Sequence, residues 1–186
     1  RLYLCIMNSV IESQLMEGMS IINIRQVLGM LELAPSKTKE LQQIILRMEE
    51  PLSRRAAWAL DHFAEIHPDI VKPLLPDLIA KIDDFNHPAY QRHILRIITN
   101  CGIPDGDPGF LISHCFDFLN SPSSPIAVKM FSMVILVQFV KKEPELIPEL
   151  IETIESLMAE ASPGIRNAGT KIIKQLQKQI RDPKNL

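Results

Sequence analysis

Apolar side chains recur at spacings of three and four residues along most of the chain, without sustained alternation of apolar and polar residues. Such spacing places apolar residues on one face of an α-helix, whereas alternation would indicate a strand. Glycine is scarce, and the prolines fall mostly at expected helix starts, where a missing N–H costs no hydrogen bond. The sequence therefore predicts an all-α protein. The expected helices cover residues 2–17, 20–33, 37–49, 52–66, 69–84, 89–101, 108–120, 124–141, 144–160 and 163–181.

Individual residues refine two of these helix starts and one helix interior. Ser20 and Ser36 precede the second and third helices, and serine side chains accept hydrogen bonds from first-turn N–H groups, so both are expected N-caps. Pro73 and Pro76 fall inside the fifth helix. Because proline breaks the hydrogen-bond ladder, that helix is expected to bend or to begin late.

A proline followed by a cation recurs along the chain with a fixed period. Pro51, Pro88 and Pro125 are 37 residues apart, and Pro163 comes one residue late. A period in this range indicates one structural unit that is copied and stacked. The predicted fold is a right-handed α-solenoid of about five antiparallel helix pairs. We expect one domain over 1–186, with an irregular N-terminal cap over 1–50 and repeats over 51–186. The cations of the period are Arg55, Arg92, Lys129 and Arg166, each 37 residues after the last.

Three segments carry a resemblance to a known family. They share a turn, a short aliphatic side chain, a cation and small residues one turn further on, as in Pro51–Ala57, Ser124–Lys129 and Ser162–Ala168. Each resembles the start of the second helix of a HEAT repeat, and the resemblance covers about residues 37–181. It implies a HEAT-like superhelix, an architecture that serves transport, scaffolding, enzyme regulation and nucleic-acid repair and does not fix the function.

The resemblance also implies an ion-pair ladder, because in the family an acidic residue near the preceding turn often pairs with the cation. The nearby candidates are Glu49, Asp84, Asn120 and Glu160. Asn120 carries no charge, so the ladder is expected to be interrupted at Lys129.

Composition narrows the classes of partner. Hydrophobic residues make up 46% and charged residues 23% of the chain, and the net charge is −2, so no sequence-wide attraction to nucleic acid or anionic membrane is expected. The three cysteines, Cys5, Cys101 and Cys115, form no CxxC motif, which favours a reducing compartment and predicts a cytoplasmic location. The apolar run Leu2–Met7 is too short to span a membrane and is interpreted as part of a capping helix.

The most distinctive segment is residues 54–65, which contains the only tryptophan, Trp58. On a helix, Arg54, Trp58, Asp61 and Glu65 share one face. The opposite, apolar face carries Leu52, Ala56, Leu60 and Phe63.

Comparison of the repeats marks two positions of this segment as unusual. Steps of 37 residues lead from Asp61 to Ile98, Ile135 and Ile172, and from His62 to Thr99, Leu136 and Ile173. One interpretation is a polar binding site, in which Trp58 is a stacking platform and Arg54 or Arg55 meets an anion. The alternative is that Asp61 is solvated or pairs with a neighbouring arginine, while Trp58 packs under a loop.

The cations of the second helices allow two interpretations as well. Arg55, Arg92, Arg96, Lys129 and Arg166 could line the inner surface of the array and contact an acidic partner. The alternative is an ion-pair ladder between repeats or scattered solvated charge, in which exposed pairs contribute little to stability.

Catalytic and metal-binding signatures are weak. No GxSxG, phosphate-binding glycine loop, HExxH or GxGxxG occurs. The set Cys101, His114, Cys115 and Asp117 has no standard zinc spacing, and the loop with Asp105 and Asp107 is too short for a calcium loop. No cofactor or metal is expected, and the sequence favours a protein without enzymatic activity.

The leading hypothesis is a non-enzymatic scaffold that binds a protein or peptide on a concave second-helix face, without a membrane partner. The expected contact residues are Arg54, Arg55, Trp58, Asp61, His62, Arg92, Arg96 and Lys129. The alternative hypothesis is a HEAT-like nucleic-acid-binding protein, or one that resembles DNA glycosylases for alkylated bases. It depends on the trio Trp58, Asp61 and Arg55, and the negative net charge argues against it.

Overall fold

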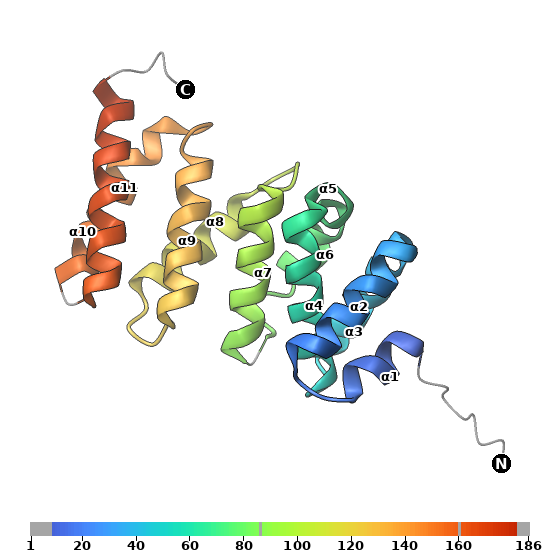
Figure 1. Cartoon of the computed structure of the whole chain (residues 1–186). Coiled ribbons are helices and arrows are strands. Elements are labelled where there is room, and N and C mark those ends of the chain that lie inside the picture. The colour runs from blue at the N-terminus through green and yellow to red at the C-terminus, as the bar shows by residue number, and fades with distance from the viewer. Residues whose placement is uncertain (1–8, 86, 160, 182–186) are drawn as a thin grey trace. The chain divides into compact units, whose positions relative to one another are not determined.

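The computed structural model describes residues 9–85, 87–159 and 161–181 (Figure 1). Within these ranges the chain is helical and contains no strand, which confirms the predicted all-α class. The chain divides into two compact units, Arg1–Cys101 and Gly102–Leu186. The two units are called unit 1 and unit 2 below. The expectation that residues 1–186 form a single domain stays a prediction.

Unit 1 consists of three successive helical hairpins. The first joins α1 to α2, the second joins α3 to α4, and the third joins the broken segment α5–α6 to α7 (Figure 1). Helix α4 is central, because it packs against α2, α3 and α7. The helices are α1 (Val10–Met16), α2 (Ile21–Leu33), α3 (Thr38–Arg47), α4 (Leu52–Ile66), α5 (Pro68–Val71), α6 (Leu75–Ile79) and α7 (Pro88–Cys101).

Helix α4 buries the apolar face that its sequence predicts. Leu52, Ala56, Leu60 and Phe63 are all buried. Asp61 is also buried, because it lies at the edge of this face towards α7. A carboxylate in this place requires polar partners from the neighbouring helix.

The prolines interrupt the fifth predicted helix as expected. Helix α5 gives way to a 3₁₀ turn at Lys72–Leu74, after which α6 begins. Pro73 lies in that turn and Pro76 in the first turn of α6, so neither removes a hydrogen bond from a regular helix interior.

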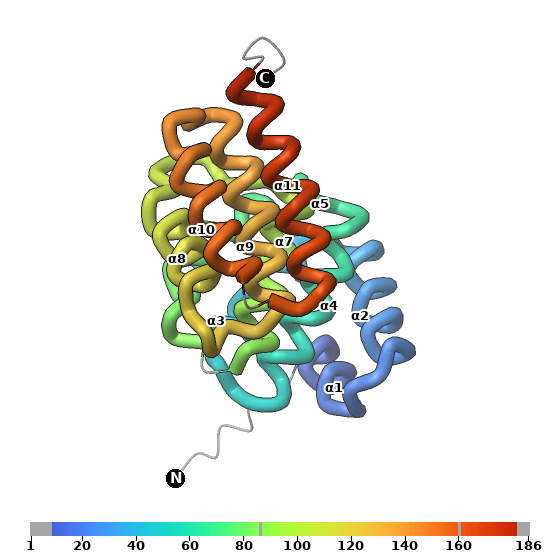
Figure 2. Tube along the Cα trace, turned by 90° about the vertical axis from the view of Figure 1, so that its left-hand side faces the viewer, coloured from blue at the N-terminus to red at the C-terminus, as the bar shows by residue number. Residues whose placement is uncertain are grey.

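Unit 2 contains two further hairpins in two layers. Helices α8 and α10 lie side by side in one layer, and α9 and α11 form the other (Figure 2). Together with unit 1 the described chain therefore has five helix pairs, as the solenoid prediction requires. The helices are α8 (Gly109–Asn120), α9 (Ile126–Phe139), α10 (Ile147–Ala159) and α11 (Pro163–Arg181), with a 3₁₀ turn at Pro144–Leu146 before α10.

The 37-residue period corresponds to the second helix of each repeat. Arg55, Arg92, Lys129 and Arg166 each lie near the start of one second helix, α4, α7, α9 and α11 respectively. The periodic cations thus occupy equivalent places along their helices.

Two predicted helix starts have different outcomes. Ser20 caps α2, since its Oγ accepts from the N–H of Asn23 at 3.2 Å. The prediction for Ser36 is wrong: this residue lies inside a 3₁₀ turn at Pro35–Lys37, and α3 begins at Thr38. Pro35 begins that turn two residues before the predicted helix start at residue 37, so Ser36 lies inside the turn and not at the capping position. Of the predicted first helix, 2–8 lie outside the described residues.

Candidate binding site on the second helices of unit 1

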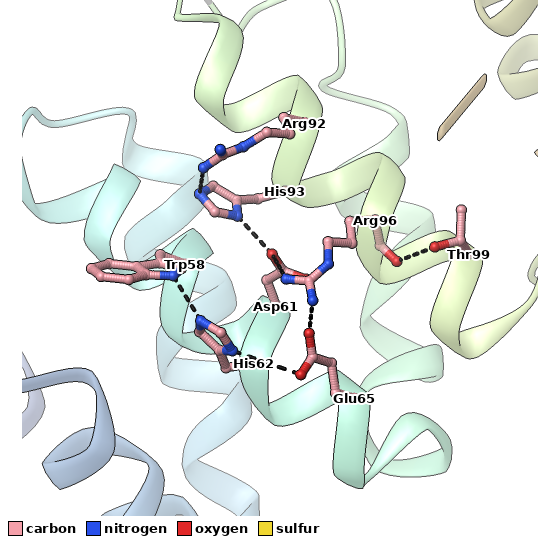
Figure 3. A network of polar contacts seen from close by, with 8 residues as sticks. All are labelled: Trp58, Asp61, His62, Glu65, Arg92, His93, Arg96 and Thr99. Atoms are coloured by element: carbon pink, nitrogen blue, oxygen red, sulfur yellow. Dashed lines mark hydrogen bonds and ion pairs between the residues drawn. The ribbon is translucent and has the colours of Figure 1, made fainter. Parts of the chain in front are cut away.

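The predicted polar residues of α4 take part in a network with α7, centred on Asp61 (Figure 3). Asp61 is only 1% exposed. Its Oδ2 atom accepts from His93 Nδ1 at 2.8 Å and from Arg96 Nη1 at 3.0 Å. Its Oδ1 atom is buried without a hydrogen-bond partner. The carboxylate therefore meets its partners through one oxygen, and both partners come from the next repeat.

The hydrogen bonds of His93 define its tautomer. Nδ1 lies 2.8 Å from the Asp61 carboxylate and therefore donates. Nε2 lies 3.0 Å from Arg92 Nη2, and because a guanidinium only donates, Nε2 accepts. His93 is thus a neutral ring that connects the exposed Arg92 to the buried Asp61.

A second arm of the network follows the side chains of α4 (Figure 3). Arg96 Nη2 forms an ion pair with Glu65 Oε1. The other oxygen of Glu65 faces His62 Nδ1 at 3.8 Å. Trp58 donates its indole N–H to His62 Nε2 at 2.8 Å, which fixes the orientation of the indole.

The network is charge-balanced over the residues that form it. Its charges are those of two carboxylates, Asp61 and Glu65, and two guanidinium groups, Arg92 and Arg96, while the histidines contribute no charge in the tautomers that their contacts require. Arg96 is shared between both carboxylates, so its charge is neutralised locally. Arg92 is different, because its contact in the network is a neutral ring.

The remaining predicted cations of α4 are occupied by contacts within unit 1. Arg54 forms an ion pair with Glu50 at 3.0 Å and lies 3.1 Å from the sulfur of Met19. Arg55 donates to the carbonyls of Leu15 at 2.8 Å and Met16 at 3.2 Å, at the C-terminal end of α1. A cation is favourable there, because the last carbonyls of a helix carry partial negative charge.

Lys129 makes the corresponding contact in unit 2. It is 8% exposed, and its Nζ donates to the carbonyl of Leu119 at 3.2 Å, near the end of α8. Lys129 is therefore not brought together with the other predicted site residues within one unit. Arg166, at the start of α11, is exposed.

The ion pairs of the described residues differ from the predicted ladder of acidic residues and periodic cations. Glu49 pairs with Arg47 at 3.4 Å and Asp84 with Lys81 at 2.8 Å, each close in sequence. Glu160 lies outside the described residues. Where the periodic cations Arg55 and Lys129 bond, they cap helix carbonyls instead.

His93 is the main site residue that sequence reasoning missed. A signal for it exists: steps of 37 residues lead from His93 back to Ala56 and on to Met130, so a histidine is as unusual in its position as Asp61 in its own. Comparison of Asp61 and His62 alone could not identify the partner, because His93 belongs to the following repeat.

The structure assigns the described cysteines no nucleophilic role at neutral pH. Cys101 and Cys115 are free thiols, and burial raises the pKa of Cys101 to about 11 and that of Cys115 to about 12. Since the thiolate is the reactive form, both groups react slowly in the folded protein. Among the described residues, no group of three or more histidine, cysteine, aspartate or glutamate side chains is placed to hold a metal ion.

Stacked helical hairpins with a repeated second-helix motif define a helical-repeat protein. A sequence comparison assigns the family: the HEAT repeat domain matches residues 11–176, so the chain belongs to the HEAT-repeat family. HEAT repeats generally serve as protein-interaction scaffolds. No curated protein and no solved structure matches the chain significantly. None of the helices in the described ranges combines the length and the apolar character that crossing a membrane requires.

Proposed function

We propose that this protein is a non-enzymatic binding scaffold and that α4 and α7 of unit 1 form its contact surface for a protein or peptide. The proposal is supported chiefly by one observation. Trp58 is partly exposed, Arg92 is exposed, and the two are attached to the two ends of a fixed polar network. Tryptophan and arginine are the residues that most often dominate binding energy, and immobilised side chains lose little entropy when a partner binds.

The charges of this surface suggest the chemistry of the partner. Arg54 and Arg96 already meet carboxylates of the chain, whereas Arg92 meets a neutral ring. A carboxylate of the partner would therefore pair with Arg92. The Trp58 N–H is used by His62, so its ring face remains for stacking on an aliphatic, proline or guanidinium group. In this proposal Asp61 and His93 are positioning residues that never touch the partner.

Two substitutions on the surface and one matched control test the proposal. Proteins captured from the native cells by tagged wild-type protein would be identified by mass spectrometry, and the affinity of each would be measured with purified protein. Trp58→Ala and Arg92→Ala should each lower the affinity for a specific partner by about tenfold or more, which corresponds to about 1.4 kcal/mol of binding free energy. Arg166→Ala removes an exposed cation at the equivalent place in α11 and should leave the affinity unchanged.

Helix content and melting temperature separate binding from folding. Both surface variants should melt within a few degrees of the wild type, because surface substitutions usually change stability little. If all three variants bind the same partners with equal affinity, the α4–α7 surface is not the contact surface. If Trp58→Ala unfolds the protein, Trp58 is a structural residue.

The nucleic-acid alternative gains no support from the arginines of α4. Arg54 and Arg55 are held by a carboxylate and by helix carbonyls, so phosphate contacts would have to displace these bonds. Titration of duplex DNA at about 50 mM salt tests this alternative, because phosphate contacts are strongest at low salt. Absence of binding would remove it.

We place the protein in the cytoplasm, a proposal supported by the free thiols of Cys101 and Cys115.

A further inference from the structure

Unit 2 contains a cavity of about 630 Å³ that the binding surface of unit 1 does not involve. It lies where α8 and α10 end and where α9 and α11 begin, because its lining residues come from those ends. Its walls include the apolar side chains of Pro122, Ile126, Leu157 and Ile165. The volume falls within the range of sites that hold small ligands or short peptide segments.

A buried cation, Lys129, also lines this cavity. An ammonium group has three N–H donors, and the bond to the Leu119 carbonyl uses one of them. Among the ion pairs of the described residues, none gives Lys129 a carboxylate partner. Because buried charges are costly without a counter-charge, the cavity presents a cation that an anion would neutralise.

The start of α9 adds a second feature that favours an anion. Pro125 occupies the N-cap position and provides no side-chain cap, and Ile126, the first residue of the helix, lines the cavity. The first N–H groups of a helix have no partner within it and carry partial positive charge, so they bind anions. Lys129 lies one turn further along the same helix.

We propose that this cavity binds a carboxylate at the end of an aliphatic chain, namely the C-terminal carboxylate of a peptide. The carboxylate lies between Lys129 Nζ and the first turn of α9, and the side chains before it pack against Leu157 and Ile165. One buried cation matches one negative charge, whereas a phosphate dianion would leave one of its two charges without a counter-charge. This site belongs to unit 2 and does not depend on the function proposed for unit 1.

Nuclear magnetic resonance titration of the full chain tests the ligand chemistry. The probe is N-acetyl-leucyl-leucine with a free carboxylate, and the control is the same dipeptide as its C-terminal amide. The acid should produce saturable shifts of the Ile126 and Ala127 amide signals, with an affinity about tenfold or more above that of the amide, as expected for a charge-assisted contact. Equal affinity of acid and amide, or absence of saturable shifts, overturns the proposal.

A blocked peptide, acetyl-leucyl-glutamyl-leucine amide, distinguishes the two sources of a carboxylate. It offers the same charge from a side chain within a chain that continues in both directions. It should bind more weakly than the acid, because the cavity must then accommodate the continuing backbone. Binding as tight as that of the acid overturns the assignment to a peptide C-terminus.

Variants locate the site and keep the test independent of folding. Lys129→Met removes the charge and retains the aliphatic stem, and it should lower the affinity for the acid about tenfold. Lys129→Arg should restore it in part. Ile126→Glu places a carboxylate at the cavity on a side chain that is 58% exposed, so it should fold normally and still exclude the acid. Lys174→Met, on the exposed surface of α11, is the matched control.

Retained affinity in Ile126→Glu, or equal losses in Lys129→Met and Lys174→Met, overturns the proposal. Glu160 provides a further check, because in sequence it separates two lining residues, Ala159 and Ala161. Glu160→Gln removes a negative charge and should bind the acid at least as tightly as the wild type. Loss of binding in this variant would contradict an anion site.

Discussion

The same repeat position holds Asp61 in unit 1 and Ile135 in unit 2. Both residues lie on second helices, two periods of 37 residues apart, and they are 1% and 0% exposed respectively. Ile135 needs only apolar neighbours, whereas Asp61 requires His93 and Arg96 from the next second helix. The fold therefore accepts either residue type at this position, provided that the neighbouring repeat supplies partners of the same character.

The comparison also indicates why the charge is present. Burying an ionic group costs desolvation free energy that its partners rarely recover in excess, so a buried ion pair is weak support for stability. Isoleucine in the corresponding place of unit 2 shows that the fold does not need the carboxylate there. What the network does in unit 1 is to orient Arg92 through His93, while Trp58 is held through His62. Orientation of the proposed contact surface is the role that the comparison favours.

Exchange of the network for its unit 2 counterparts should produce the largest effect. Asp61→Ile alone leaves the buried N–H of His93 Nδ1 without its acceptor and leaves Arg96 with Glu65, and it should lower the free energy of unfolding by about 3 kcal/mol. The triple variant Asp61→Ile, His93→Met and Arg96→Met imports the residues found at Ile135, Met130 and Met133. Its free energy of unfolding should lie within about 1 kcal/mol of the wild-type value, or above it. Urea unfolding followed by Trp58 fluorescence and circular dichroism measures both.

Ile135→Val is the control in unit 2, where a lost methylene should cost about 0.5–1.5 kcal/mol without any such rescue. The binding measurement sharpens the comparison, since the triple variant should fold well and still bind the unit 1 partner more weakly. A triple variant as unstable as Asp61→Ile would show that the network stabilises the fold and cannot be replaced by packing.

Close helix packing in unit 2 should produce an effect of intermediate size. A Cβ atom at Gly169 would lie 2.5 Å from Met158 Sδ and 3.0 Å from Ile154 Cγ2, so α10 and α11 approach each other too closely for alanine without movement of Met158. Gly169→Ala should therefore lower stability by about 1–3 kcal/mol, the usual cost of overpacking. Gly29→Ala, on α2 of unit 1, meets nothing within 4 Å and should instead raise stability by about 0.5–1 kcal/mol.

The thiol of Cys115 reports on unit 2 in this experiment. With Cys5 and Cys101 replaced by serine, labelling of Cys115 at pH 8 requires opening of the unit, because burial raises its thiol pKa to about 12. Gly169→Ala should accelerate labelling, and Gly29→Ala should not. Similar labelling rates in both variants would mean that α10 and α11 accommodate alanine at residue 169 without loss of stability.

The period made much of the fold predictable, because each copy repeats the same helix start. Pro51, Pro88, Pro125 and Pro163 all lie at the beginning of a second helix, as the spacing predicts. Capping was less predictable. Whether Ser36 caps a helix depends on where the preceding 3₁₀ turn begins, and Pro35 determines that through its fixed backbone angle.

The candidate site was predictable only in part. Comparison of the repeats identified Asp61 as an unusual polar residue, but its partners His93 and Arg96 are 32 and 35 residues away and meet it only through packing of α4 on α7. The contacts of Arg55 and Lys129 with helix carbonyls were missed for a related reason. The resemblance implies acidic side chains as partners of these cations. Backbone carbonyls occur at every residue, so the sequence does not show which of them accepts a bond from a cation.

Acid should reveal the smallest difference between the units, through Glu50 in unit 1. Burial acts to raise the pKa of Glu50, but the contacts with Arg54 and Tyr90 and the charges of Arg54 and His87 together outweigh it, so the pKa lies below its ordinary value. The resulting stabilisation is complete above the ordinary pKa and is lost as pH falls through the folded-state pKa. Glu50→Gln should thus cost no more than about 0.5 kcal/mol at pH 7, as for exposed pairs, and nothing at pH 2.

Glu143→Gln in unit 2 should behave in the opposite way. A hydrogen bond with Glu145, followed by the repulsion between the two carboxylates, raises the pKa of Glu143 above its ordinary value. A raised carboxyl pKa means that the folded state loses stability as pH rises through it, so the substitution should stabilise unit 2 slightly at pH 7. Urea midpoints at pH 7 and pH 2, read from Trp58 fluorescence, measure the effect in unit 1, and urea midpoints at pH 7, read from Cys115 labelling, measure the effect in unit 2. A loss of stability in Glu143→Gln at pH 7, or a loss in Glu50→Gln that persists at pH 2, would mean that these side chains act through packing and not through charge.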